Sequence, residues 1–182
     1  MKIAAFDLET SGLEGDWGCI LCASFCPITD EATIGEAYTL TRNVRPKDPM
    51  DDGSLAKKIK AEIEKYNLIV GWNSKLFDIP FLNSRLLNAG LTSCYPQMHL
   101  DVMWYASGSS ARLASRKLDN VSKFFKTKTR KYEVQNDVLQ AARYGDEKAL
   151  AEVIKHCEAD VQITSEVYWR LLPGIRNIHR GG

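Results

Sequence analysis

The sequence predicts an α/β fold: a mixed five-stranded sheet, made of a three-stranded antiparallel meander plus two parallel strands, flanked by helices. Three apolar segments lie close together early in the 182-residue chain, at residues 2–8, 18–28 and 32–41. They predict the meander, because strands joined by short connections usually pair antiparallel. Helical patterns then alternate with short apolar runs, as in sheets that contain parallel strands. With no internal repeat or linker, we expect one domain over residues 1–175 and a disordered tail at 176–182.

Each remaining element has a local signature. A turn at 29–31 separates the second and third strands, and Ser54 is a good N-cap for the first helix. Pro80 is tolerated in the first turn of the second helix, Gly90 is placed to end that helix, and Pro173 ends the last one. We predict further strands at 68–72 and 98–102, and helices at 54–66, 77–89, 117–126, 134–144 and 150–171.

The composition is that of an ordinary globular protein. The net charge is +1, so an anionic partner would have to be met by a local basic patch. No apolar run reaches about 18 residues, and the N-terminus lacks a signal-peptide layout, so we expect no membrane association. Five scattered cysteines favour reduced thiols and a cytoplasmic location. The spacing of Cys19, Cys22 and Cys26 suggests a zinc site as one interpretation. Because no histidine accompanies these cysteines, packing in the core is favoured.

The first strand ends in two carboxylates, Asp7 and Glu9. Because side chains alternate along a strand, both point to the same face, and Leu8 points to the other. Two like charges this close repel, and a bound cation would neutralise them. A solvated strand end is the alternative, and this pair alone does not decide between the two.

A third carboxylate, Asp78, lies where the fourth strand has ended and the second helix begins. Asn73 shares the same turn, and the aromatic residues Trp72 and Phe77 lie on either side of it. Aromatic and polar groups at the carboxyl end of a strand suit a base-stacking site. Asp is also a favoured N-cap, so a purely structural role for Asp78 fits equally well.

The last helix carries His156 and Asp160, which are four residues apart and therefore share a face. Both lie at the border of the apolar stripe, where a metal ligand and a titrating base would be placed. A simple ion pair between them fits the same spacing.

Together these motifs resemble the three exonuclease motifs of the DEDD superfamily, the DnaQ-like 3′–5′ exonucleases of the ribonuclease H-like fold. The matching segments are DLETSGL at 7–13, NSKLFD at 73–78 and HCEAD at 156–160. The middle motif, with HLDVM at 99–103 and KLDNVS at 117–122, is most similar to the proofreading domain of family B DNA polymerases. The likeness spans residues 2 to 172.

The resemblance implies that Asp7, Glu9, Asp78 and Asp160 ligate two divalent metal ions, Mg²⁺ or Mn²⁺. Two cations stabilise both the attacking and the leaving oxygen in phosphodiester cleavage, and hard oxygen ligands suit these ions. By the same resemblance, four residues would contact the terminal nucleotide: Thr10, Leu13, Asn73 and Phe77.

His156 departs from the pattern of the family. The members that the motifs resemble carry either a tyrosine four residues before the last Asp or a histidine five residues before it. Here a histidine occupies the tyrosine spacing relative to Asp160. We interpret His156 as a general base, whose activity falls in acid as the imidazole becomes protonated.

The predicted function is that of a free-standing 3′–5′ exonuclease acting on single-stranded nucleic acid, with DNA favoured over RNA. Its partners would be a 3′ end and a polymerase or replication protein in trans. The densest basic run, residues 123–131, supplies Lys126, Lys128 and Arg130 as candidate backbone contacts, although basic runs are often just solvated surface. Two rivals are a ribonuclease H-like endonuclease or resolvase, and a non-catalytic binding module.

Overall fold

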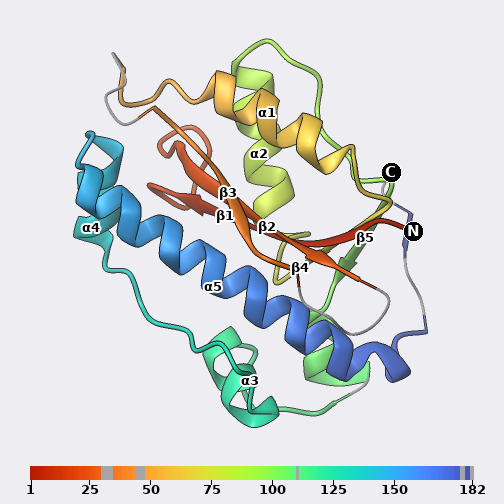
Figure 1. Cartoon of the computed structure of the whole chain (residues 1–182). Helices are drawn as coiled ribbons and strands as arrows, with labels where there is room; N and C mark the ends of the chain where they lie inside the picture. Colours follow the sequence, from red (N-terminus) through yellow and green to blue (C-terminus); the bar gives the residue numbers. More distant parts are fainter. Residues whose placement is uncertain (30–34, 44–47, 110, 177–178, 181–182) are drawn as a thin grey trace.

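The computed structural model describes residues 1–29, 35–43, 48–109, 111–176 and 179–180. It shows one mixed sheet covered by helices (Figure 1). The strand order is β3-β2-β1-β4-β5-β6, with β1 and β4 at the centre. The strands are β1 (Ile3–Thr10), β2 (Ile20–Ile28), β3 (Tyr38–Thr41), β4 (Leu68–Gly71), β5 (Met98–Asp101) and β6 (His179–Arg180).

The pairing of the strands confirms the predicted mixed sheet. Strand β2 is antiparallel to both β1 and β3, which is the meander, whereas β4 is parallel to β1 and to β5. The structure adds a strand that the sequence did not reveal: His179–Arg180 pair antiparallel with Met98–His99. Part of the predicted disordered tail is therefore ordered. Two residues are too few for any periodic pattern, so only pairing with a neighbour identifies this strand.

The predicted helices are all present, with their ends shifted by a few residues. The helices are α1 (Gly53–Ile63), α2 (Asp78–Asn88), α3 (Leu118–Phe125), α4 (Asn136–Arg143) and α5 (Glu147–Leu171), with a π-helical turn at Tyr105–Ser109 and a 3-10 turn at Leu172–Gly174. Gly90 has a φ of 71°, as expected for a helix stop. Helix α1 begins one residue before the predicted cap Ser54. Most of the predicted turn at 29–31 and the start of the third strand lie outside the described residues.

The sheet separates two layers of helices. Helix α5 crosses β1 and β2 on one face, and α1 and α2 cover the other (Figure 1). Alternation along β1 decides what each face receives: Phe6 and Leu8 join the core beneath α1 and α2, whereas Ile3 and Ala5 face the core beneath α5. The odd-numbered carboxylates that follow therefore face α5. None of the described helices is both long and apolar enough to cross a bilayer.

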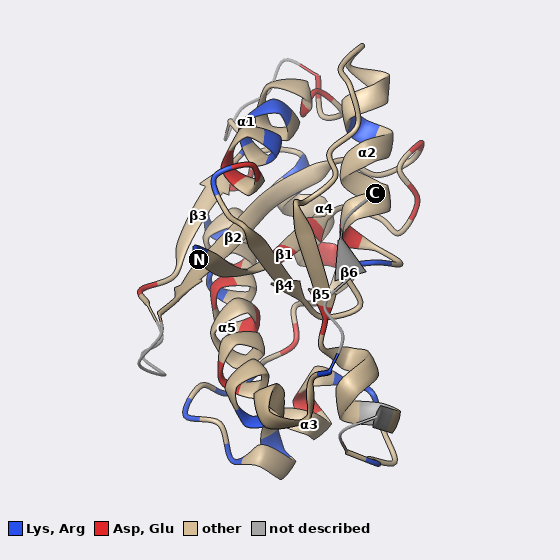
Figure 2. Ribbon diagram, turned by 90° about the vertical axis from the view of Figure 1, so that its right-hand side faces the viewer, with Lys and Arg blue, Asp and Glu red and all other residues tan. Residues whose placement is uncertain are grey.

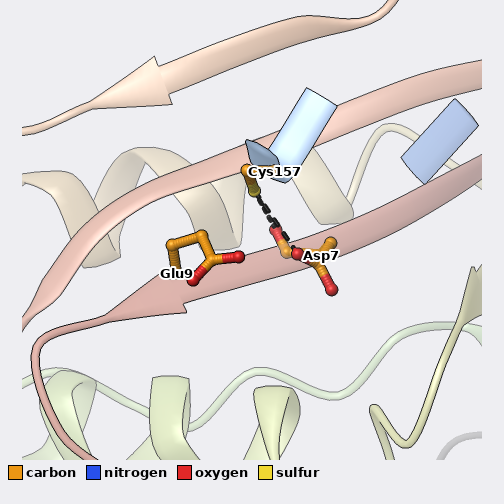
Figure 3. A group of neighbouring side chains, drawn as sticks. All are labelled: Asp7, Glu9 and Cys157. Atoms are coloured by element: carbon orange, nitrogen blue, oxygen red, sulfur yellow. Dashed lines mark hydrogen bonds between the residues drawn. The ribbon is translucent and has the colours of Figure 1, made fainter. Parts of the chain in front are cut away.

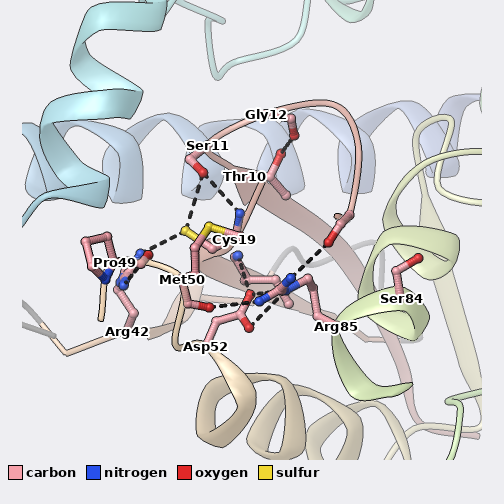
Figure 4. Close-up of polar contacts among 12 residues, drawn as sticks. Thr10, Ser11, Gly12, Cys19, Arg42, Pro49, Met50, Asp52, Ser84 and Arg85 are labelled. Atoms are coloured by element: carbon pink, nitrogen blue, oxygen red, sulfur yellow. Dashed lines mark hydrogen bonds and ion pairs between the residues drawn. The ribbon is translucent and has the colours of Figure 1, made fainter. Parts of the chain in front are cut away.

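A buried ion pair ties the β1–β2 loop to the helices on its side of the sheet (Figure 4). Arg85 of α2 contacts both carboxylate oxygens of Asp52 at 3.0 and 2.9 Å, and it also donates to the carbonyl oxygens of Gly15 and Met50. Asp52 in turn accepts from the backbone N–H of Ile20 at 2.7 Å. Asp52 therefore holds the loop after β1 instead of capping α1 with its side chain.

The contacts of Arg85 predict a stability effect that depends on the shape of its guanidinium group. Arg85→Lys keeps the charge but loses the planar donors that contact three partners, so we expect the free energy of unfolding to fall by about 2 kcal/mol. Urea denaturation measures the change, with Arg170→Lys at an exposed position of α5 as the control. Equal urea midpoints for Arg85→Lys and the wild type would show that the guanidinium contacts of Arg85 contribute nothing to stability.

Candidate active site

A cavity of about 960 Å³ opens where β1, α2 and α5 meet. Its lining brings together seven residues nominated from the sequence: Asp7, Glu9, Asn73, Phe77, Asp78, His156 and Asp160. They are separated by up to 153 positions in the chain, since the first is residue 7 and the last is residue 160. The fold therefore collects all three motif segments around one space.

Asp7 and Glu9 lie at the end of β1, facing α5 (Figure 3). The register of β1 against β2 shifts between Glu9 and Thr10, and such bulges are common beside active sites because they redirect side chains. The thiol of Cys157 donates to the backbone oxygen of Asp7 at 3.6 Å and to its Oδ2 at 3.5 Å. Among the described residues, Asp7, Glu9 and Cys157 form a group whose ligand atoms all lie within 4.8 Å of one another.

Asp78 is the first residue of α2, and Phe77 occupies the N-cap position. The Oδ1 atom of Asp78 accepts a hydrogen bond from the backbone N–H of Leu8 in β1 at 2.9 Å, so this carboxylate links α2 to the strand that carries Asp7. Asp78 therefore does not occupy the N-cap position of α2, and the alternative that it caps this helix is wrong. Asp78 is buried, at 3% exposure, beside the same cavity.

His156 and Asp160 reach the cavity from α5. The Nε2 atom of His156 lies 3.3 Å from Oε1 of Glu9 and 3.9 Å from Oδ2 of Asp160. The tighter partner of Asp160 Oδ2 is the ammonium group of Lys131, which the sequence reading did not nominate. The second oxygen, Oδ1, is buried and has no hydrogen-bond partner among the described residues.

The electrostatics of the site follow from burial of several acids with one cation. Burial, reinforced by Asp160, raises the pKa of Asp7 to about 7. Burial and the charge of Asp7 also raise the pKa values of Glu9 and Asp78. Burial by itself would lower the pKa of Lys131, but Asp160 outweighs it and the net pKa is raised. Lys131 alone thus offsets only part of the carboxylate charge.

Burial lowers the pKa of His156 and the charge of Asp160 raises it. The effect of burial is the larger of the two, so the pKa lies below its ordinary value. The imidazole is therefore neutral at neutral pH, and the simple ion pair with Asp160 is not formed there. The ring of Tyr132 packs edge-on against it, with centroids 5.5 Å apart.

The donor set fits hard divalent cations. The four carboxylates offer only oxygen atoms, and one of these atoms, Oδ1 of Asp160, is buried without a partner among the described residues. The raised pKa values of Asp7, Glu9 and Asp78 indicate that the charges of these three groups need compensation. Asp78 and Asp160 stand outside the 4.8 Å group formed by Asp7, Glu9 and Cys157, although they line the same cavity. This cluster is therefore where the chain would hold such ions.

Asn73 lines the cavity in a strained backbone conformation, with a φ of 60°. Asp101 stabilises it by accepting the backbone N–H groups of Asn73 at 3.0 Å, Lys75 at 3.2 Å and Met103 at 3.2 Å. The Asp101 carboxylate therefore holds the backbone on both sides of this turn. Phe77 contributes its ring to the cavity and stacks obliquely on Phe81.

The other nominated substrate residues are outside the described cavity lining. Thr10 is buried and its hydroxyl donates to the carbonyl oxygen of Gly12, while Leu13 is 80% exposed. The basic residues Lys126, Lys128 and Arg130 are exposed and do not line the cavity. The cations that do line it are Arg116, Lys117, Lys123 and Lys131. A linear run of charge does not reveal which of its members turns inward.

Glu166 explains how Lys131 arrives at the site. This buried carboxylate of α5 accepts the backbone N–H groups of Lys128 at 2.8 Å and Thr129 at 3.1 Å. The segment after α3 is thereby fastened along α5, and Lys131 follows it beside Asp160. No sequence periodicity reveals that this segment is held against α5, so the role of Lys131 could be recognised only from the fold.

The raised pKa of Asp7 predicts how stability varies with pH in the metal-free protein. Between the ordinary carboxyl value of 3.8 and about 7, the native state keeps a proton that the unfolded state has released. Stability therefore falls as pH rises through this range. We expect the melting temperature of Asp7→Asn to exceed that of the wild type by about 5 °C more at pH 8 than at pH 4.5. A difference that stays constant with pH would contradict the raised pKa.

Comparisons with known proteins agree with this architecture. A family model described as the RNase_H superfamily matches residues 4–172. Among solved structures, the family B DNA polymerase of the hyperthermophilic archaeon Pyrobaculum calidifontis is similar, with a TM-score of 0.73 and 16% identity. The alignment covers 95% of this chain but 25% of the polymerase chain, so the likeness concerns the fold of one part of that enzyme. No curated protein matched the chain. Since the family model spans nearly all of the sheet and its helices, the chain belongs to the RNase_H superfamily.

Proposed function

We propose that this protein is a 3′–5′ exonuclease that hydrolyses phosphodiester bonds at the 3′ end of single-stranded nucleic acid, with DNA favoured over RNA. The observation that carries the proposal is the convergence of Asp7, Glu9, Asp78 and Asp160 from three elements on one cavity. Burying four acids around one lysine is unfavourable for a structural module, because most of their charge stays uncompensated. It is useful to a protein that binds cations there.

In this proposal the four carboxylates hold two divalent ions, Mg²⁺ or Mn²⁺. Two such ions supply the charge that stabilises the attacking and leaving oxygens of an in-line displacement. Lys131 pairs with Asp160 and adds positive charge to the lining of the cavity. Asn73 and Phe77 contact the terminal nucleotide, the first through its amide and the second through its ring.

His156 is the proposed proton acceptor. A general base must be neutral at working pH and within reach of the proton that it takes. The lowered pKa of His156 supports the first condition. The position of its Nε2 atom, 3.3 Å from Oε1 of Glu9 and 3.9 Å from Oδ2 of Asp160, supports the second. Protonation in acid removes the acceptor, so activity falls with decreasing pH.

The partner in the cell would be a nucleic acid 3′ end, with a polymerase or replication protein acting in trans. This part of the proposal rests on the likeness to a family B DNA polymerase. The roles of Thr10, Leu13, Lys126, Lys128 and Arg130 in binding remain predictions, as do the domain limits and the cytoplasmic location.

A digestion with Mg²⁺ tests the proposal against its rivals. Circular single-stranded DNA is incubated beside linear DNA and RNA strands that carry a label at the 5′ end. An exonuclease leaves the circle intact and shortens the linear strands one nucleotide at a time. Cleavage of the circle would identify an endonuclease, and an unchanged set of strands, with binding, would identify a non-catalytic module.

A further inference from the structure

The cavity has a second part that the hydrolytic site does not use. Beyond the carboxylates, its lining includes Trp72 after β4 and the residues Arg116 and Lys117 before α3. Lys and Arg residues flank α3 in Figure 2. A volume of about 960 Å³ is at the upper end of the range for small-ligand pockets, so it has room for more than a terminal nucleotide.

Two contacts join three separate segments into one surface here. The indole N–H of Trp72 donates to the carbonyl oxygen of Arg116 at 3.1 Å. The guanidinium group of Arg116 lies over the ring of Trp104, 5.0 Å from its centroid. Trp104 follows β5 and is 43% exposed. The cation is thus held in place by a flat aromatic face beside the cavity.

The charges of this surface are available to an anion. Lys123 is paired with Asp119 of the same helix at 2.7 Å, and Glu133 is a further acid in the lining. In the part of the chain that the structure covers, neither Arg116 nor Lys117 has a carboxylate within 4.0 Å. Exposed cations beside aromatic rings are the combination that binds single-stranded nucleic acid, since phosphates meet the charges and bases meet the rings.

We propose that Trp72, Trp104, Arg116 and Lys117 form a subsite for the nucleotides immediately upstream of the reacting 3′ end. Arg116 and Lys117 contact the phosphates, and the Trp104–Arg116 stack supports a base. The proposal rests on the proposed function, because the upstream strand is defined by an end held at the carboxylates. It deepens that function by making the substrate a strand of several nucleotides, not an isolated nucleotidyl ester.

Binding to a labelled strand tests the subsite directly. The probe is a 5′-fluorescein single-stranded DNA of about 12 nucleotides, titrated by anisotropy at several salt concentrations with Asp7→Asn protein, which does not digest it. In this background we expect Arg116→Gln to weaken binding about tenfold and to reduce the salt slope by about one. Trp104→Ala should weaken binding about tenfold with an unchanged slope, because it removes stacking and no charge. Arg112→Gln, an exposed neighbour outside the cavity lining, is the matched control.

A kinetic comparison separates failure of the subsite from failure of the proposed function. The p-nitrophenyl ester of thymidine 5′-monophosphate has a scissile phosphate but no upstream strand. With Asp7 intact, Arg116→Gln should lower the ratio of kcat/KM on the oligonucleotide to kcat/KM on this ester about tenfold. If the wild type hydrolyses both substrates while neither variant alters this ratio, binding or the salt slope, the subsite is wrong and the nuclease stands. If the wild type hydrolyses neither, the proposed function fails.

Discussion

Asp7→Asn and Asp160→Asn are expected to lower kcat about a thousandfold or more while leaving the protein folded. Each change removes a charged oxygen that would hold a cation at the reacting phosphate, and groups of this kind contribute several kcal/mol to the transition state. The effect of Asp7→Asn on the metal-free fold has the opposite sign. The pKa of Asp7 is raised because its charge is buried near Asp160, so removing the charge relieves repulsion and raises the melting temperature.

Two measurements check this combination. Initial rates on linear single-stranded DNA give kcat, and calorimetric titration with Mn²⁺ counts the bound ions. Glu158→Gln is the control, because this carboxylate lies two residues before Asp160 on α5 but accepts a hydrogen bond from Thr39 of β3 at 2.8 Å. Activity of Asp7→Asn within tenfold of the wild type, or an unchanged ion count, would show that these acids are not the metal ligands.

His156→Ala is expected to lower kcat about a hundredfold, which is typical for loss of a general base. The variant should also lose the acid limb of the pH–rate profile. In the wild type this limb lies below pH 6.5, because burial lowers the pKa of the imidazole from that value. Protonation below the pKa removes the acceptor, so the wild-type rate falls as the pH falls.

His156→Tyr adds a sharper comparison. It places the residue more common in the resembled family at the same helical position, so we expect partial recovery of kcat relative to alanine. The profile should keep no limb from imidazole titration. Near-normal turnover of His156→Ala, measured beside an inactive Asp7→Ala, would show that His156 is not the base. A folded state for each variant is verified by its melting temperature.

The sequence revealed the elements whose signals are local. Apolar runs located all five longer strands. The apolar stripe of α5 predicted His156 and Asp160 at its border, whereas the structure buries both, at 8% and 5% exposure. Alternation alone put Asp7 and Glu9 on one face of β1, and this holds because the period of a strand is fixed by its backbone. Boundaries were less secure: Ser54 looked like a cap, yet α1 begins at Gly53.

The features that the sequence did not reveal depend on contacts between residues far apart in the chain. The basic run at 123–131 suggested Lys126, Lys128 and Arg130, whereas Glu166 fastens this segment so that Lys131 enters the site instead. Arg116 gave no signal, since its position depends on Trp72 and Trp104, which are 44 and 12 residues away in sequence numbering.

The sequence by itself thus determined which residues carry acid chemistry and which face of each element they occupy, because those properties depend on residue type and on backbone period. The tertiary structure alone decided which cations oppose the acids and how strongly each acid is perturbed. Burial and the distances between charges are properties of packing, and they arise only when β1, α2 and α5 close around the same cavity.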